Sequence, residues 1–362
     1  MLVGPGFRVE RCVRYRYSYS KCSRCADACP HEAIRLFDAG VELLADRCQS
    51  CALCAAVCPT EALTEKSVSA EYLLEVVGDA KQLTIACALS GVEGEAVVPC
   101  LGALHPVVLA DMSRRGITLQ LAGTGHCAEC AHAAQGPGLI SLHLAAQEVL
   151  CGVVEKQQRA PLVLQSSGTT ESDKKRNAHD ASRRGLFRRF VGRSVDVLSG
   201  KSEAPPAPLK AIRAAPPFRP ERKVVLNALY AAEGEEAIRI ARHPALPAED
   251  FRVERGCTYC EACVRVCPTG ALQLLENNAG WRLVFLNDRC VACDVCAEVC
   301  QPKVLRQCDG EEVIVNKQKG RMLVGVPKQR CVSCDRMFVT ENGADVCPIC
   351  SGDDEDFANI FG

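Results

Sequence analysis

The stretch Cys257-Thr258-Tyr259-Cys260-Glu261-Ala262-Cys263-Val264-Arg265-Val266-Cys267-Pro268 decides how the second half of the chain folds. Its cysteines are separated by two, two and three residues, and the run Cys290-x2-Cys293-x2-Cys296-x3-Cys300 repeats that spacing. Two-residue loops wrap the backbone tightly, so that its N–H groups turn toward a negatively charged metal cluster. Aromatic residues make up only 5% of the 362 residues, so cysteine chemistry rather than aromatic packing is expected to organise much of the chain.

This spacing is typical of two [4Fe–4S] clusters. Each close run of three thiolates holds three corners of one cubane, and the fourth cysteine of the run binds the other cubane. The expected ligand sets are Cys257, Cys260, Cys263 and Cys300 for one cluster, and Cys290, Cys293, Cys296 and Cys267 for the other. Structural zinc is the alternative for such closely spaced thiols.

The same phrase recurs near the N-terminus in a less regular form. The run Cys48-x2-Cys51-x2-Cys54-x3-Cys58 is complete, but Cys22-x2-Cys25-x3-Cys29 has Tyr19 where the first cysteine belongs, and the nearest upstream thiol is Cys12. The expected sets are Cys12, Cys22, Cys25 and Cys58 for one cluster, and Cys29, Cys48, Cys51 and Cys54 for the other. If Cys12 does not reach the site, the first set holds a three-iron cluster instead.

A β-hairpin is expected between the paired cysteine runs, at 34–44 in the first module and at 272–285 in the second. Both modules resemble bacterial-type two-[4Fe–4S] ferredoxins, over residues 10–68 and 250–308. The resemblance implies a pseudo-twofold fold of hairpins and short helices, and a role in electron transfer.

Between the modules, apolar runs at 82–89, 96–109 and 117–122 predict a small α/β domain. It contains four further cysteines, Cys87, Cys100, Cys127 and Cys130. The stretch resembles the iron–sulfur subunit of hydrogenase–heterodisulfide reductase complexes, a family in which a [2Fe–2S] cluster passes electrons between partner enzymes. The resemblance implies that these four cysteines are its ligands, although the family spaces the last two more widely. Buried free thiols in an ordinary core are the alternative.

Near the C-terminus, Cys331-x2-Cys334 and Cys347-x2-Cys350 are separated by 12 residues, which predicts a zinc ribbon with four cysteine ligands. A rubredoxin-like iron site is the alternative. Zinc has no accessible redox change, so a structural role is expected. The acidic run Asp353–Asp356 would repel phosphates, and no nucleic-acid partner is expected. Cys151 and Cys308 are left over as free thiols.

Residues 155–223 carry 16 Lys and Arg against 7 Asp and Glu, together with many Ser and Pro, which predicts a basic tether. A short amphipathic helix around residues 182–191 would allow docking to a protein or to a membrane surface.

The expected architecture is α+β and multidomain, with two bicluster ferredoxin modules flanking a small α/β domain. The expected divisions are 1–68 for the first module, 69–154 for the α/β domain, 155–245 for the basic linker with short helices, 246–325 for the second module and 326–362 for the zinc ribbon.

Enzyme motifs are missing from the sequence: it contains no Gly-x-Gly-x-x-Gly fingerprint, Walker loop or nucleophile elbow. The N-terminus has no export signal, and no apolar run is long enough to span a bilayer, so a soluble, cytoplasmic protein is expected.

We expect an electron-transfer protein, or a subunit of a larger oxidoreductase complex, that relays single electrons between donor and acceptor oxidoreductases. The alternative is an assembly, maturation or redox-sensing factor for a metalloenzyme, with the clusters as cargo or sensor. A nucleic-acid-binding protein with a structural cluster is a third and weaker reading.

Overall fold

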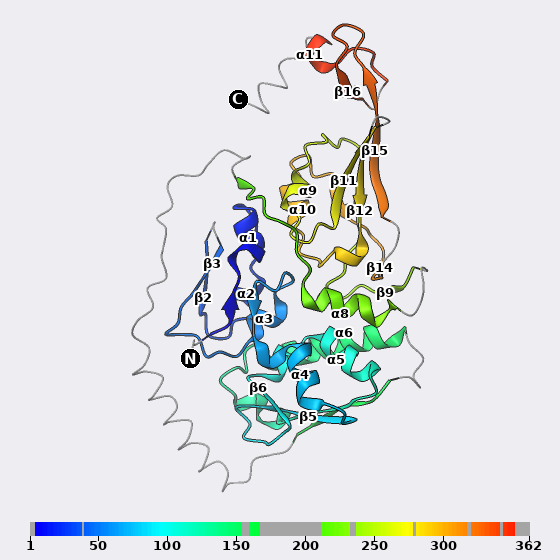
Figure 1. Cartoon of the computed structure of the whole chain (residues 1–362). Helices are drawn as coiled ribbons and strands as arrows, with labels where there is room; N and C mark the ends of the chain where they lie inside the picture. Colours follow the sequence, from blue (N-terminus) through cyan, green and yellow to red (C-terminus); the bar gives the residue numbers. More distant parts are fainter. Residues whose placement is uncertain are drawn as a thin grey trace.

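The structure is a computed structural model, and it describes residues 4–37, 40–153, 159–166, 211–231, 237–277, 280–316, 320–340 and 343–351. The amphipathic helix predicted at 182–191 and the acidic run at 353–356 lie outside the described residues. In Figure 1 the central α/β domain forms one end of an elongated molecule, the two ferredoxin modules lie above it, and the C-terminal ribbon forms the other end.

The first module is built from short elements around its cysteines. They are β1 (Gly6–Phe7), η1 (Val9–Arg11), α1 (Val13–Arg16), α2 (Arg24–Asp27), β2 (Ile34–Phe37), β3 (Gly40–Leu43), α3 (Leu53–Val57), β4 (Leu63–Thr64) and η2 (Lys66–Val68). Strands β2 and β3 form the predicted antiparallel hairpin, with Ile34 opposite Leu43, and β1 pairs with β4.

The central domain holds a parallel sheet of order β6-β5-β7-β8. Its strands are β5 (Gln82–Cys87), β6 (Ala96–Val98), β7 (Thr118–Ala122) and β8 (Leu162–Gln165), and its helices are α4 (Ala70–Val77), η3 (Leu101–Ala103), α5 (Pro106–Arg114), η4 (Thr124–Glu129) and α6 (Gly136–Gly152). Leu83, Ile85, Leu119 and Leu121 are fully buried in it. Parallel strands need such burial because helices cover their faces.

The second module follows the plan of the first. Its elements are β10 (Phe251–Val253), α9 (Ala262–Val266), β11 (Leu272–Asn277), β12 (Gly280–Phe285), η8 (Asn287–Arg289), α10 (Val295–Val299) and β13 (Leu305–Gln307). Strands β11 and β12 form the predicted hairpin, and β10 pairs with β13 as β1 pairs with β4. The long strand β15 (Arg321–Arg330) extends this sheet from β12 and leads to β16 (Met337–Val339) and α11 (Pro348–Ser351).

In the stretch predicted as a linker with short helices, the described ends contain one short helix and also two strands that the sequence does not predict. Strand β8 joins the central sheet beside β7, α8 (Glu221–Leu229) packs on α5, and β9 (Arg239–Ala241) pairs with β14 (Glu312–Ile314). The reason is local apolar content, because Leu226 and Ile240 are buried. The high charge and proline content of this stretch predicts a linker, and its apolar segments are too short to indicate strands in the sequence.

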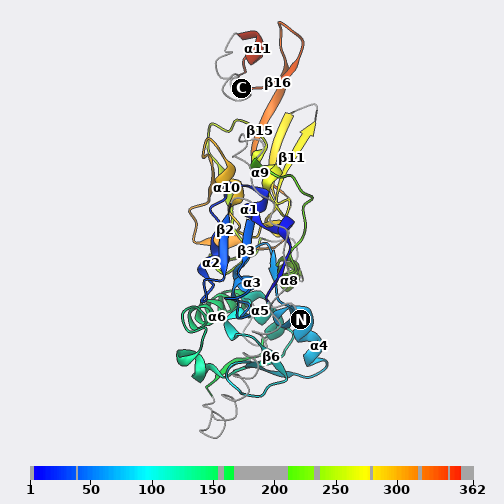
Figure 2. The same ribbon diagram turned by 90° about the vertical axis from the view of Figure 1, so that its left-hand side faces the viewer.

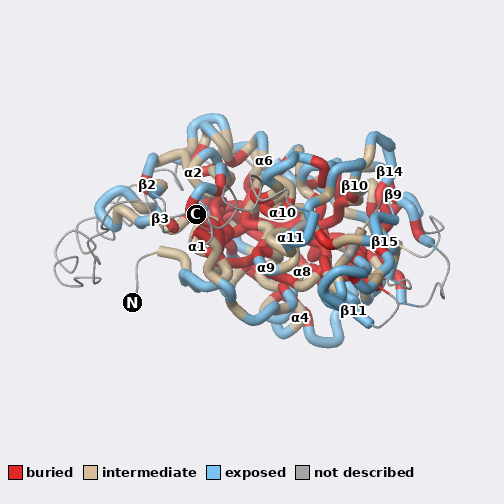
Figure 3. Tube along the Cα trace, turned by 90° about the horizontal axis from the view of Figure 1, so that it is seen from above, coloured by how far each residue is buried: buried red, intermediate tan, exposed pale blue. Residues whose placement is uncertain are grey.

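Hydrophobic contacts hold the parts together. Val13 and Tyr17 of the first module share one buried cluster with Val266 and Val295 of the second. The hydroxyl of Tyr230, at the end of α8, donates to the carbonyl of Leu150 on α6 at 2.9 Å. Figure 2 shows the same parts stacked along the long axis, and Figure 3 shows buried residues gathered through the middle of the molecule.

Candidate iron–sulfur centres

Each of the three complete cysteine runs folds into the same left-handed loop. The residues on either side of the second cysteine of each run have φ between 54° and 63°. They are Ser50 and Ala52, Tyr259 and Glu261, and Ala292 and Asp294. Left-handed backbone costs a non-glycine residue about 1–2 kcal/mol. Such strain persists only where the surroundings impose it, which is typical of ligand-binding loops.

The turn after the last cysteine of each run is also repeated. Its third residue has positive φ in all four copies, at Glu32, Glu61, Gly270 and Lys303. In the first module this turn brings a backbone N–H to the cysteine sulfur, from Ala33 to Cys29 Sγ and from Ala62 to Cys58 Sγ, each at 3.3 Å. Such hydrogen bonds stabilise a thiolate that binds a cluster and tune its potential.

The irregular run of the first module lacks this loop. Ser23, which follows its first cysteine, has φ −127°, and the short helix α2 begins at the next residue. Cys12 enters from the N-terminal end of α1 instead and is buried. Four thiols line one cavity, namely those of Cys12, Cys22, Cys25 and Cys58. Burial raises the pKa of Cys25 to about 12, and the other three thiols add to this shift. Cys12 therefore lies in the same cavity as the three other thiols of its predicted set.

The second predicted set of this module lines a separate cavity. Its thiols are those of Cys29, Cys48, Cys51 and Cys54. Burial raises the pKa of Cys54, and the charges of the three other thiols of this set and of Cys25 add to the shift. The two cavities of the module are therefore neighbours.

The second module brings its eight cysteines together in the predicted two sets. Burial raises the pKa of Cys263 to about 12, and Cys260, Cys257 and Cys300 add to the shift. Burial likewise raises the pKa of Cys296, with contributions from Cys293, Cys267, Cys290 and, from the other set, Cys263.

These four sets suit iron–sulfur clusters in donor chemistry. Buried thiols that lie close together repel one another once ionised, so their pKa values rise. The cationic iron atoms of a cluster favour the thiolate form instead, so the thiol protons are released when a cluster binds. Which cysteine binds which cluster stays a prediction.

The central domain gathers its four cysteines around another cavity, which is lined by Cys87, Cys100, Cys127 and Cys130. Burial raises the pKa of Cys100 to about 12, and Cys87, Cys51 and Cys130 contribute to the shift. Gly136 lines the same cavity, and a Cβ at this position would lie only 3.2 Å from Cys100 Sγ. The glycine therefore keeps the space beside the thiols free of a side chain.

The C-terminal knuckles bring four sulfur atoms within 4.8 Å of one another. They belong to Cys331, Cys334, Cys347 and Cys350. Tetrahedral zinc with bonds of about 2.3 Å holds its sulfur ligands about 3.8 Å apart, which this group can reach with little movement. The backbone N–H of Cys347 donates to Cys331 Sγ at 3.2 Å and lowers the pKa of Cys331 to about 6. Hydrogen bonds of this kind favour the thiolate form, in which a cysteine binds a metal.

Sequence reasoning missed a contact between the first module and the central domain. His31 Nε2 lies 2.9 Å from His132 Nδ1, and both rings lie within 4.8 Å of Cys51 Sγ. The signal was available in the repeat, because His31 stands where the other Cys-Pro copies have Thr60 and Thr269. Burial, followed by the charge of His31, lowers the pKa of His132 to about 4.

All 26 cysteines are described, and all are free thiols. Cys151 is buried and accepts a hydrogen bond from Gln147 Nε2 at 3.1 Å, while Cys308 is half-buried. Neither lines the cavities of the cysteine sets. Within the described ranges, no helix is long and apolar enough to cross a membrane.

Comparison with known proteins identifies the two modules. The family model for the 4Fe-4S dicluster domain matches residues 20–62 and 256–304. The polyferredoxin protein MvhB of Methanothermobacter marburgensis is 37% identical over 65 residues, which cover 15% of this chain and 16% of that protein. The match thus spans about a sixth of this curated relative's length. The prediction of two iron–sulfur ferredoxin modules of the 4Fe–4S type is confirmed.

Proposed function

We propose that this chain is an electron relay with five iron–sulfur sites in series, which carries single electrons between partner oxidoreductases. Each cluster supplies one-electron transfer when bound. The proposed ligands are the two sets of each module for four [4Fe–4S] clusters, and Cys87, Cys100, Cys127 and Cys130 for a [2Fe–2S] cluster. Zinc in the C-terminal ribbon is proposed to be structural.

The proposed order begins at the central domain. Cys51 of the first module contributes to the raised pKa of Cys100, so the two thiols lie within electrostatic reach. The hydrogen-bonded pair His31 and His132 spans the same junction. Within the first module, Cys25 of one set contributes to the raised pKa of Cys54 in the other.

The contact between the two modules carries the proposal. Cys22 packs against the buried cluster that contains Val13, Tyr17 and Val295, and Cys263 and Cys293 of the second module pack against the same cluster. Burial lowers the pKa of Arg16 beside them, while the thiols Cys267 and Cys293 raise it. Without this contact the chain would be two independent ferredoxins on one tether.

The second module completes the series, because Cys263 lies near enough to Cys296 to raise its pKa. Close spacing between neighbouring clusters is what one-electron steps require. We therefore infer an entry or exit point at each end of the series, where donor and acceptor proteins dock. Cysteines that bind metals must stay reduced, which a reducing compartment favours, and we propose a cytoplasmic location.

Metal analysis with EPR spectroscopy tests the proposal on the anaerobically purified full chain. Four cubanes and one [2Fe–2S] cluster require about 18 irons per chain, with zinc in addition. The variant Cys293→Ala should lose one cubane signal of the dithionite-reduced protein and keep the signals of the first module. The matched variant Cys308→Ala, at a thiol outside every set, should keep all signals. An iron content that fits two cubanes or fewer would reject the relay.

A further inference from the structure

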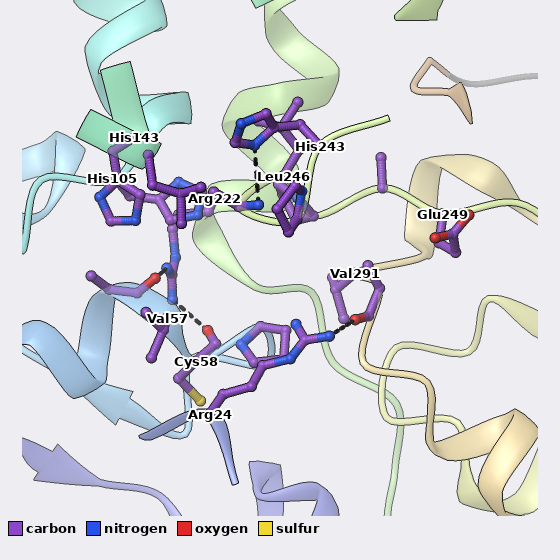
Figure 4. Close-up of a pocket in the computed structure, with 18 of the residues that line it drawn as sticks. Arg24, Val57, Cys58, His105, His143, Arg222, His243, Leu246, Glu249 and Val291 are labelled. Atoms are coloured by element: carbon purple, nitrogen blue, oxygen red, sulfur yellow. Dashed lines mark hydrogen bonds between the residues drawn. The ribbon is translucent and has the colours of Figure 1, made fainter. Parts of the chain in front are cut away.

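A cavity of about 790 Å³ lies where the first module, the central domain and the second module meet. Figure 4 shows its wall, with Val57 and Cys58 from the end of α3, His105 and His143 beside Arg222, and His243 and Leu246 on the segment before β10. Small-molecule sites are typically about 300–1,000 Å³. The cavity thus has the size of a ligand site, and none of the proposed clusters accounts for it.

The lining is mainly apolar, and its arginines are neutralised. Arg222 pairs with Glu61 at 2.9 Å, Arg242 with Glu249 at 3.1 Å, and Arg24 with Asp294 at 3.3 Å. The apolar wall consists of Val57, Pro59, Leu139, Leu142, Leu246 and Val291. Lys223 also lines the cavity, but its Nζ is buried and donates to the carbonyl of Pro247 at 3.1 Å. The paired arginines and this buried lysine offer little free charge to a phosphate, so an uncharged ligand fits this lining better.

Two histidines of the lining present hydrogen-bond donors. The Nδ1 atom of His105 accepts from the backbone N–H of Val107, and that of His243 accepts from the backbone N–H of Ala245, each at 3.3 Å. A neutral imidazole that accepts at Nδ1 carries its proton on Nε2, so each ring offers an N–H. These donors call for a ligand with acceptor atoms such as carbonyl oxygens.

The cavity also touches both modules close to their cysteine sets. Cys58 lines it from the first module, and Val291 and Ala292, which lie between Cys290 and Cys293, line it from the second. A ligand here would lie against the backbone of two cysteine loops. This location favours a ring that can take up and release electrons.

We propose that this cavity binds a flat, uncharged, redox-active ring with carbonyl acceptors, the chemistry shared by quinone head groups and isoalloxazine rings. The choice of a redox-active ring rests on the proposed relay. The binding itself follows from the apolar wall and the imidazole donors.

Isothermal titration calorimetry of the anaerobic, cluster-loaded full chain tests this inference with menadione and, in a separate arm, with riboflavin. One or both rings should bind once per chain. Binding of menadione alone identifies a quinone site, and binding of riboflavin alone identifies an isoalloxazine site. No binding of either ring up to its solubility limit would overturn the inference.

Two variants tie the binding to the cavity. Leu142→Trp fills it and should weaken binding by at least about tenfold, whereas the matched variant Leu164→Trp, on the exposed face of β8, should leave binding unchanged. His243→Phe, at a half-exposed position, should weaken binding about fivefold because one hydrogen bond is lost. Binding that is equal in wild type and Leu142→Trp would place the ring elsewhere and refute the site. Iron content and EPR signals of the same samples report on the relay independently.

Discussion

The ion pair of Arg222 with Glu61 ties α8 to the first module, and its removal should destabilise the fold strongly. Arg222 is 13% exposed and Glu61 9% exposed, and their atoms lie 2.9 Å apart. The same guanidinium also donates to the carbonyls of Ala56 and Cys58. Arg222→Met keeps an unbranched apolar side chain at this position and removes the hydrogen bonds of the guanidinium.

The cost can be worked from this geometry. Breaking a buried pair by removing one partner costs about 3–5 kcal/mol. Glu61 keeps two backbone donors, the N–H groups of residues 221 and 222 at 2.7 Å, so the lower value, about 3 kcal/mol, applies. For a folding unit of this size each kcal/mol lowers the unfolding midpoint by about 2–4 °C, which predicts a shift of about 6–12 °C.

Circular dichroism at a fixed heating rate measures the shift on cluster-loaded protein, because multidomain proteins with bound clusters do not unfold in one reversible step. The control is Arg35→Met, which breaks the ion pair with Glu42, where the two side chains are 66% and 50% exposed. It should cost less than about 1 kcal/mol. Equal shifts in the two variants would refute the assignment of Arg222 as a buried anchor.

Three further predictions concern the metal sites. Cys12→Ser should lower the iron content by about one per chain and give the EPR signal of an oxidised three-iron cluster; an unchanged iron content would show that Cys12 is not a ligand. Ala292→Gly should leave the thermal midpoint unchanged or raise it, because glycine tolerates φ 55°, whereas Ala297→Gly inside α10 should cost about 1 kcal/mol; similar losses at both positions would contradict a strained loop. Chelation should remove about one zinc per chain, and Cys334→Ser should do the same, while iron stays constant; a rubredoxin-like visible spectrum from this site would show iron there instead.

The cysteine loops were predictable because their geometry is local. Gaps of two and three residues between cysteines determine the cysteine loops. Both hairpins were predictable for another local reason, because apolar runs that begin near Ile34 and Leu272 flank short turn sequences. The replacement of a cysteine by Tyr19 also pointed to Cys12, which the structure brings to the same cavity as Cys22 and Cys25.

Long-range contacts were not predictable from one sequence. Val13 and Val295 pack together although they are far apart in the chain, and nothing local marks them as partners. Similarly, the short apolar segment Leu162–Gln165 is too weak a pattern to identify β8, which is fixed by its pairing with β7. The contact of His31 with His132 depends on the docking of two domains and appears only in three dimensions.

EPR power saturation of the dithionite-reduced full chain gives the most direct test that the two modules form one series. Tyr17→Asp places a charge in the buried contact between them, and Val9→Asp places the same charge at a position that is 39% exposed. Both variants should keep their iron. Tyr17→Asp should weaken the magnetic coupling between modules, so that its signals saturate at lower power than those of wild type and Val9→Asp. Identical saturation in all three proteins would contradict the relay.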